Sequence, residues 1–129
     1  MKYEHANDIQ QRIERIIKIL ELNHIDPHRV VCMRSYGSKS RALARIWSFP
    51  KILQKALDAR AYYVIEVISH RFDRLNREEQ DKTLIHELMH IPKTFSGGLV
   101  PHKYFDKKID RKTVDEMYRK YLNRLLDKS

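Results

Sequence analysis

Cysteine, glycine and proline are scarce in this chain of 129 residues, and long hydrophobic runs are absent. The single cysteine, Cys32, excludes an internal disulfide bond, so a reducing, cytoplasmic compartment is expected. No stretch approaches the roughly 18 apolar residues that a membrane span requires, and the polar residues 1–10 contain no signal-peptide core. Three glycines and four prolines leave little room for flexible linkers, and we expect residues 1–129 to form a single domain.

Basic residues outnumber acidic ones by 26 to 17, which gives the chain a net charge of +9. Such a charge favours polyanionic partners, nucleic acid above all, but it also fits a surface that only keeps the protein in solution. Because no known nucleic-acid-binding motif accompanies the charge, nucleic-acid binding is an alternative function. The cations on which this alternative depends are Lys39, Arg41, Arg45, Lys103, Lys107, Lys108, Arg111 and Lys112.

Hydrophobic periodicity divides the chain into helices and strands. Isoleucines at helical spacing predict an amphipathic helix over about residues 4–22, and β-branched and aromatic residues predict the clearest strand at 62–69. Asn76 and Glu79 have the spacing of a capping box, which predicts the start of a further helix. These elements predict an α+β fold, a small mixed β-sheet packed against an N-terminal helix, a motif-bearing helix and a C-terminal helix. The other expected elements are strands at 29–36 and 42–49, a short helix at 50–59, the motif helix at 76–91, a loop at about 93–108 and a last helix from about 110.

The sequence His-Glu-Leu-Met-His at residues 86–90 lies inside the predicted motif helix. Positions i and i+4 share one face of a helix, so the imidazoles of His86 and His90 are expected to point toward one metal ion. Glu87 lies about 100° further round the helix, where it addresses a metal-bound water rather than the metal. This pattern is typical of a catalytic zinc site, in which the zinc-activated water loses its proton to Glu87 as general base. Glu87 would then deliver a proton to the leaving amine.

A catalytic zinc site needs a third protein ligand and an open fourth position for water. His102 is the first choice, because it follows His90 by twelve residues and lies beyond the Gly97-Gly98 turn, which lets the chain fold back toward the metal. A carboxylate would also serve as the third ligand. The alternatives of this kind are Glu116 or the adjacent Asp115 on the last helix and, as a further option, Asp106.

Hydrolysis of a peptide bond develops negative charge on the carbonyl oxygen, so a hydrogen-bond donor is expected beside the metal. Tyr104 and Tyr118 lie in segments that should return near the metal. Either phenol is a candidate stabiliser of this oxyanion, although tyrosines of this kind also serve as packing residues.

The stretch from His86 to His102, with the sequence HELMHIPKTFSGGLVPH, resembles the signature of the small metallopeptidases found in archaea and phages. It is also similar to the compact zincin domains called minigluzincins and, more distantly, to the SprT-like proteases. The resemblance covers about residues 62–103 and implies a zincin fold, one zinc ion and hydrolysis of peptide bonds. It implies the roles given above for His86, Glu87 and His90. The archaeal and phage pattern implies His102 as the third ligand, whereas the minigluzincin comparison implies a glutamate.

The sequence therefore predicts a zinc-dependent metallopeptidase that acts on peptides or proteins, as a monomer or a homodimer. In zincin-like folds a strand that precedes the motif helix borders the cleft and pairs with the substrate, and the order of the elements points to residues 62–69.

The alternative is a basic nucleic-acid-binding or DNA-associated protein whose zinc site is structural or inactive. A latent enzyme, covered by its own tail or by a second copy, is a third hypothesis.

Overall fold

The computed structural model describes residues 1–104 and 107–127, apart from the side chains of residues 104 and 107. Helices and strands alternate irregularly along this part of the chain, as in other α+β proteins. In chain order the elements are β1 (Lys2–His5), α1 (Asn7–Ile19), the 3-10 helix η1 (Pro27–Arg29), β2 (Val30–Tyr36), β3 (Ala44–Trp47), α2 (Lys51–Ala56), β4 (Tyr63–Ile68), α3 (Ser69–Phe72), α4 (Arg77–Met89), β5 (Lys103–Tyr104), β6 (Lys107–Lys108) and α5 (Arg111–Asp127).

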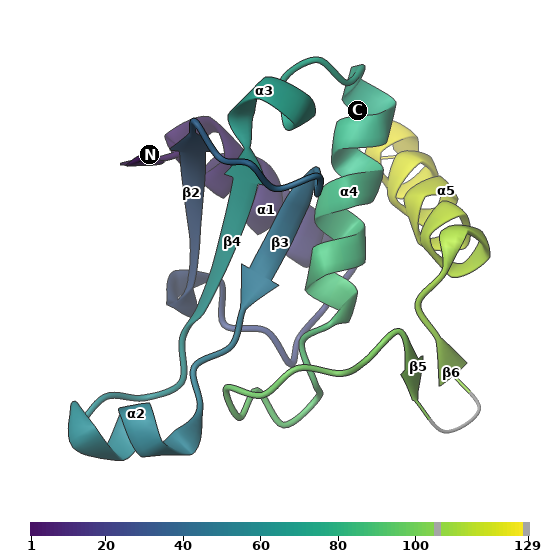
Figure 1. The fold of residues 1–129 in the computed structure, drawn as a ribbon. Helices are drawn as coiled ribbons and strands as arrows, with labels where there is room; N and C mark the ends of the chain where they lie inside the picture. Colours follow the sequence, from purple (N-terminus) through teal and green to yellow (C-terminus); the bar gives the residue numbers. More distant parts are fainter. Residues whose placement is uncertain (105–106, 128–129) are drawn as a thin grey trace.

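The main sheet has the strand order β1-β2-β4-β3 (Figure 1). β2 and β4 are parallel, whereas β1 and β3 run antiparallel to their neighbours, so the predicted α+β fold with a small mixed sheet is confirmed. The expectation that residues 62–69 border the cleft is wrong, because β4 pairs with β2 on one side and with β3 on the other. The nearly unbroken apolar sequence of β4 is that of an interior strand, and β3 is the edge strand instead.

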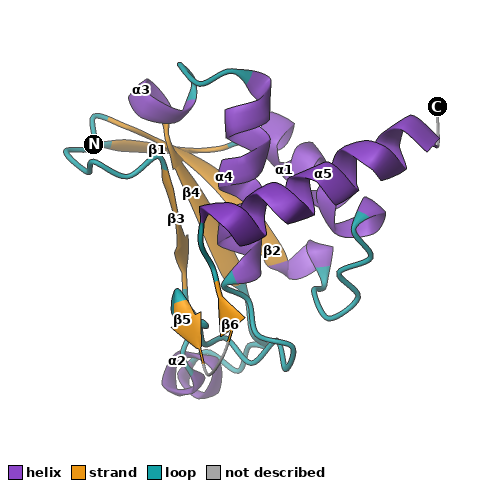
Figure 2. Ribbon diagram, turned by 90° about the vertical axis from the view of Figure 1, so that its right-hand side faces the viewer, coloured by secondary structure: helices purple, strands orange, loops and turns teal. Residues whose placement is uncertain are grey.

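Helices α1 and α4 cover one face of the sheet, and α5 packs against both of them (Figure 2). The isoleucine stripe of α1 faces the sheet, and its members Ile9, Ile13 and Ile16 are fully buried. Complete burial of one such side chain stabilises the fold by roughly 1.5–3 kcal/mol, because it removes apolar surface from water. The core therefore lies between this sheet face and the helices.

The first turns of α4 are fixed by a helix cap and a buried ion pair. The side chain of Asn76 accepts a hydrogen bond from the backbone N–H of Glu79 at 2.9 Å, as the sequence predicts for an N-cap. Arg12 of α1 donates to Asp81 of α4 at 2.6 Å, and the exposed fractions of the two side chains are only 11% and 8%. Because a buried charge is costly without its partner, this pair holds α4 against α1 across the core.

The edge strand β3 is held to β4 by side chains as well as by its backbone. Arg45 and Trp47 both donate to the same carboxylate oxygen of Glu66, each at 2.9 Å. Glu66 is 1% exposed, and the guanidinium of Arg45 also lies 5.1 Å from the centre of the Trp47 ring. These contacts fix the strand that runs beside α4.

Three differences from the predicted elements concern short segments. The first helix begins at Asn7 rather than near residue 4, because residues 2–5 pair with β2 as strand β1. All four side chains of β1 are exposed, so no apolar pattern marks it in the sequence. The short helix α3 and the β5–β6 hairpin inside the predicted loop are likewise not foreseen. None of the described helices is both long and apolar enough to cross a membrane.

Candidate metal centre

Helix α4 presents His86 and Glu87, and His90 caps its C-terminal end. Leu84 and Leu88 anchor this part of the helix, since their exposed fractions are 0% and 1%. The backbone of His90 keeps helical dihedral angles, φ −77° and ψ −10°. The i, i+4 relation between the two histidines is therefore preserved, and both rings lie on the same face of the helix.

The loop that follows α4 turns at Gly97, a position that only glycine can occupy without strain. Its φ is +96°, and a Cβ atom at this position would lie 2.1 Å from the carbonyl oxygen of Phe49. The Tyr63 hydroxyl accepts a hydrogen bond from the Gly97 N–H at 2.9 Å and donates to the Gly98 carbonyl at 2.8 Å. The Phe49 N–H donates to the Gly97 carbonyl at 2.7 Å. The glycine turn is therefore clamped from both sides by residues far away in sequence.

Two further contacts hold this loop on either side of the turn. The Gln54 side-chain amide on α2 donates to the carbonyls of Phe49 and Ser96, each at 2.8 Å. Beyond the turn, the Val100 N–H donates to the carbonyl of His90 at 2.8 Å. The chain is thus returned to the end of α4 just before it reaches residue 102.

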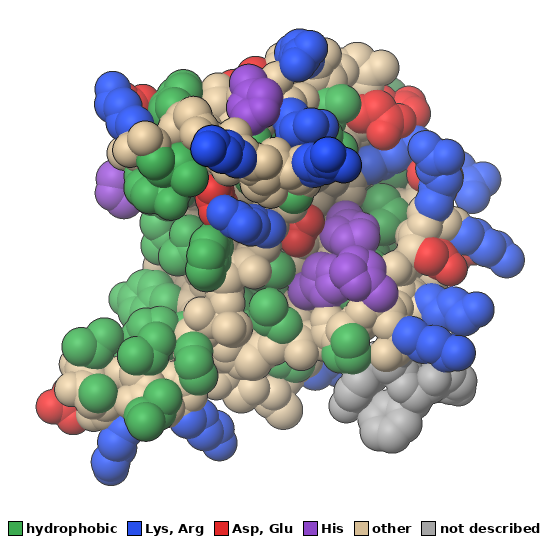
Figure 3. Space-filling model, viewed as in Figure 1, with side chains coloured by type: hydrophobic (Ala, Val, Ile, Leu, Met, Phe, Trp, Pro, Cys, Tyr) green, Lys and Arg blue, Asp and Glu red, His purple; other side chains and the backbone are tan. Residues whose placement is uncertain are grey.

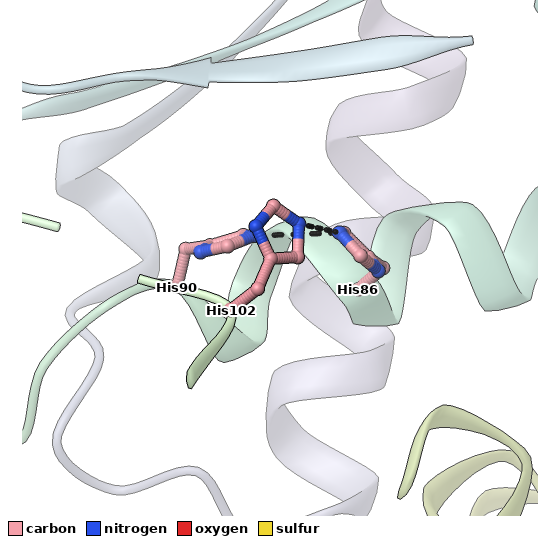
Figure 4. Close-up of side chains that lie close together, drawn as sticks. All are labelled: His86, His90 and His102. Atoms are coloured by element: carbon pink, nitrogen blue, oxygen red, sulfur yellow. Dashed lines mark hydrogen bonds between the residues drawn. The ribbon is translucent and has the colours of Figure 1, made fainter. Parts of the chain in front are cut away.

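As a result, the Nε2 atoms of three histidines converge (Figure 4). The Nε2 atom of His86 lies 3.2 Å from that of His102 and 3.3 Å from that of His90. Nitrogen ligands at the usual zinc distance of about 2.0–2.1 Å in a tetrahedral arrangement are about 3.3 Å apart. The three rings therefore fit a zinc ion, and they would hold it with His86, His90 and His102 as ligands.

The protonation of the rings also suits a metal site. His90 Nδ1 lies 2.6 Å from the Val100 carbonyl oxygen, and donation of its N–H to this oxygen leaves Nε2 free to bind a metal. Burial, together with the neighbouring His90 and His102, lowers the pKa of His86 to about 4. Burial also lowers the pKa of His90. At neutral pH the imidazoles of His86 and His90 are thus in the neutral form that coordinates metal ions.

Glu87 lines a cavity of about 270 Å³ together with His86. Only 8% of its surface is exposed, and burial raises the pKa of its carboxyl group to about 7. A carboxyl group with a pKa near 7 exchanges protons readily at neutral pH, as a general base must. Glu87 thus lies beside His86 but is not one of the three clustered residues, and its role as general base stays a prediction.

The other predicted site residues whose side chains the structure describes are not part of the three-histidine cluster. Glu116 is exposed and is not part of this histidine cluster, and Asp115 binds the ammonium group of Lys82 at 3.1 Å. Asp106 and the side chain of Tyr104 lie outside the described residues. Tyr118 is buried, and the centre of its ring lies 5.3 Å from the Lys82 ammonium. Lys82 precedes His86 by one helical turn of α4. Tyr118 therefore packs against α4 at Lys82 rather than at the metal ligands.

A larger cavity of about 600 Å³ lies against another face of α4 and contains none of these groups. It is lined by Ile85, Leu88 and Met89 of the helix and by apolar residues of the following loop. His86 and Glu87 line the smaller cavity instead. The space-filling view shows histidine side chains at the surface with Lys and Arg side chains gathered near them (Figure 3).

Sequence reasoning missed the residues that position His102. Gln54 and Tyr63 hold the glycine turn, and the Val100 carbonyl orients His90. The adjacent glycines at 97 and 98 are a signal that the backbone turns sharply there. Gln54 carries no such signal, because its partner Ser96 lies 42 residues away and a surface glutamine has no distinctive pattern.

Comparison with known proteins adds one finding. A family model described as "Putative phage metallopeptidase" matches residues 1–128, nearly the whole chain. The chain matches none of the curated proteins and none of the solved structures with which it was compared. The match does not bear on the minigluzincin and SprT-like resemblances, which stay predictions.

Proposed function

The chain belongs to this family of phage metallopeptidases, and from that premise we propose that it is a zinc-dependent peptidase with Glu87 as its general base. The observation that carries the proposal is the convergence of three imidazoles beside a buried carboxyl group. A metal that is held only for structure is usually enclosed by four protein ligands. The described residues supply three, which leaves a position open for substrate chemistry.

A zinc ion bound by the three histidines would supply a Lewis acid that lowers the pKa of water and polarises the scissile carbonyl. The residues of the chain do the rest. His86, His90 and His102 hold the ion, and Val100 fixes the tautomer of His90. Glu87 accepts the proton of the attacking water and passes it to the leaving amine, which its pKa of about 7 allows in both directions near neutral pH.

The substrate is proposed to lie along β3 as an additional strand, as in a zincin-like fold. β3 is the edge of the sheet and packs beside α4, and no described strand pairs with its outer edge. An extended peptide that pairs with this edge places its backbone beside the histidines, and backbone hydrogen bonds provide affinity without regard to sequence.

Replacement of Glu87 by Gln tests the proposal most directly. The amide keeps the size of the side chain but cannot accept a proton, so kcat for peptide hydrolysis should fall by about 10²–10⁴-fold. The zinc content, measured by elemental analysis, should stay at one ion per chain because the ligands are intact. Glu78→Gln, an exposed glutamate of the same helix, is the matched control and should keep its activity. A wild-type protein without bound metal, or a fully active Glu87→Gln, contradicts the proposal.

A second candidate function is a basic nucleic-acid-binding or DNA-associated protein with a structural or inactive zinc site. The net charge of +9 and the Lys and Arg side chains on the histidine-bearing face favour it (Figure 3). Affinity for DNA that falls steeply as the salt concentration rises would support this function. Peptide hydrolysis that depends on Glu87 would argue against an inactive site.

A further inference from the structure

The cavity beside His86 and Glu87 extends along α4 toward its first turns. Glu79, Lys82 and Thr83 form one wall on the same helix face as His86. Ala44 at the start of β3 and Val114 of α5 are buried members of the lining, with exposed fractions of 8% and 5%. Pockets for whole small molecules usually measure about 300–1,000 Å³, so a cavity of about 270 Å³ suits a single side chain.

Carboxylates of the protein already surround Lys82, one of the cations that line this cavity. The Lys82 ammonium binds Glu78 at 3.0 Å and Asp115 at 3.1 Å, and Glu79 lies 4.0 Å away. Arg111 also lines the cavity, but no ion pair within the described part of the chain involves its guanidinium. A ligand that enters the cavity therefore meets one positive charge that has no carboxylate of its own.

The position of Arg111 at the cavity is set by the start of α5. The Asp110 side chain accepts a hydrogen bond from the Thr113 N–H at 2.9 Å, and the Thr113 hydroxyl accepts one from the Asp110 N–H at 3.0 Å. These reciprocal bonds fix the first turn of the helix, in which Arg111 is the first residue. The same turn contains no acidic residue that would neutralise the arginine.

We propose that Arg111 makes this cavity a subsite for an acidic side chain, so that the protein prefers peptides with Asp or Glu next to the bond that it cleaves. The inference rests on the proposed function, because it assigns the substrate class of the same site. A guanidinium binds a carboxylate through two parallel hydrogen bonds, which gives both affinity and orientation.

Binding to the Glu87→Gln protein loaded with zinc measures this preference without any cleavage. The probes are peptides that differ only in having Glu, Gln or Lys at one position, with that position scanned across six residues. At one position, the Glu peptide should bind on the order of tenfold to a hundredfold more tightly than the Gln peptide, the range expected for a charge-assisted hydrogen bond. Adding Arg111→Glu should reverse the order, so that the Lys peptide binds best.

Lys112→Glu is the matched control, because it changes the charge equally at the next residue, which does not line the described cavity. It should leave the preference for Glu in place. Equal binding of the three peptides at every position, no binding of any of them, or an equal effect of Lys112→Glu and Arg111→Glu overturns the inference. If the preference is present but the wild-type protein cleaves none of the peptides, the inference stands as a binding site and the proposed hydrolase function fails.

Discussion

The two halves of the candidate metal centre are built in different ways. His86 and His90 come from one helix, whose cap, buried leucines and ion pair with α1 fix it as part of the core. His102 comes from a loop, and its place depends on a few side-chain hydrogen bonds from α2 and β4 to the backbone around Gly97. The helical half is thus secured by the stability of the whole domain, and the loop half by local contacts.

This difference predicts how the two halves respond to substitution. Damage to the contacts of α4 should lower the free energy of unfolding of the entire protein. Damage to the loop contacts should instead lower metal affinity while the domain stays folded, because local openings cost less than global unfolding. The predictions that follow test this contrast.

The largest effect is expected from Asp81→Ala on the helical side. The substitution leaves the Arg12 guanidinium buried without its partner, which should lower the free energy of unfolding by about 3–5 kcal/mol. Arg77→Ala is the control, because it removes an exposed partner of the same carboxylate, 3.6 Å away, and should cost at most about 1 kcal/mol. Urea unfolding of both metal-free variants measures the two costs, and equal values would show that the buried pair does not anchor α4.

The pH dependence of stability should reveal the buried Glu87. Its pKa is raised from 4.5 to about 7 in the folded protein, so between these pH values the folded state binds the proton more tightly than the unfolded state. The free energy of unfolding contributed by this group therefore falls as pH rises from about 4.5 to 7. Glu87→Gln lacks this loss, so its stability relative to the wild type should increase over that window and level off above it. Thermal unfolding of both proteins with a chelator present checks this, and a constant difference between them would contradict the raised pKa.

On the loop side, Gly97→Ala should reduce zinc affinity by about tenfold to a hundredfold. This is the usual effect of losing a residue that orients a metal ligand without binding the metal itself. The added methyl group would lie 2.1 Å from the Phe49 carbonyl oxygen, so the loop must move and carry His102 with it. Gly98→Ala is a close control, because a Cβ atom there meets only the Ser96 hydroxyl at 3.9 Å. Competition with a zinc chelator measures the affinities; similar values for the two variants would mean that the turn does not position the ligand.

A smaller effect is expected from Gln54→Ala. It removes one hydrogen bond to the loop, at the Ser96 carbonyl, and one to the Phe49 carbonyl, each worth about 0.5–1.5 kcal/mol, while leaving the glycine turn itself intact. Hydrogen exchange of residues 96–102 should become faster, with exchange in α4 unchanged. Lys55→Ala, on the exposed side of the same short helix, should change neither. Faster exchange throughout α4 in Gln54→Ala would remove the distinction between the two halves.

The same distinction explains what the sequence could and could not predict. The helix that carries His86 and His90 is predictable because its cap at Asn76 and its apolar periodicity are local. His102 was also a candidate from its distance beyond two glycines, but the choice between it and Glu116 depends on contacts with Gln54 and Tyr63 that no local pattern records.

The sheet was only partly predictable for a similar reason. Strands β2, β3 and β4 follow from residue types, but only the order of the elements points to β4 as the border of the cleft. Its parallel pairing with β2 and antiparallel pairing with β3 are long-range and place it inside the sheet. The exposed strand β1 exists through backbone pairing and leaves no pattern in the sequence.

The link between Val100 and His90 is made entirely by main-chain atoms on the valine side. One bond runs from the Val100 N–H to the His90 carbonyl and the other joins the Val100 carbonyl to the His90 ring. Any amino acid except proline supplies both groups. The orientation of the His90 imidazole therefore does not depend on the side chain at position 100. Replacement of Val100 by a polar residue should change the lining of the neighbouring 600 Å³ cavity without rotating the ring.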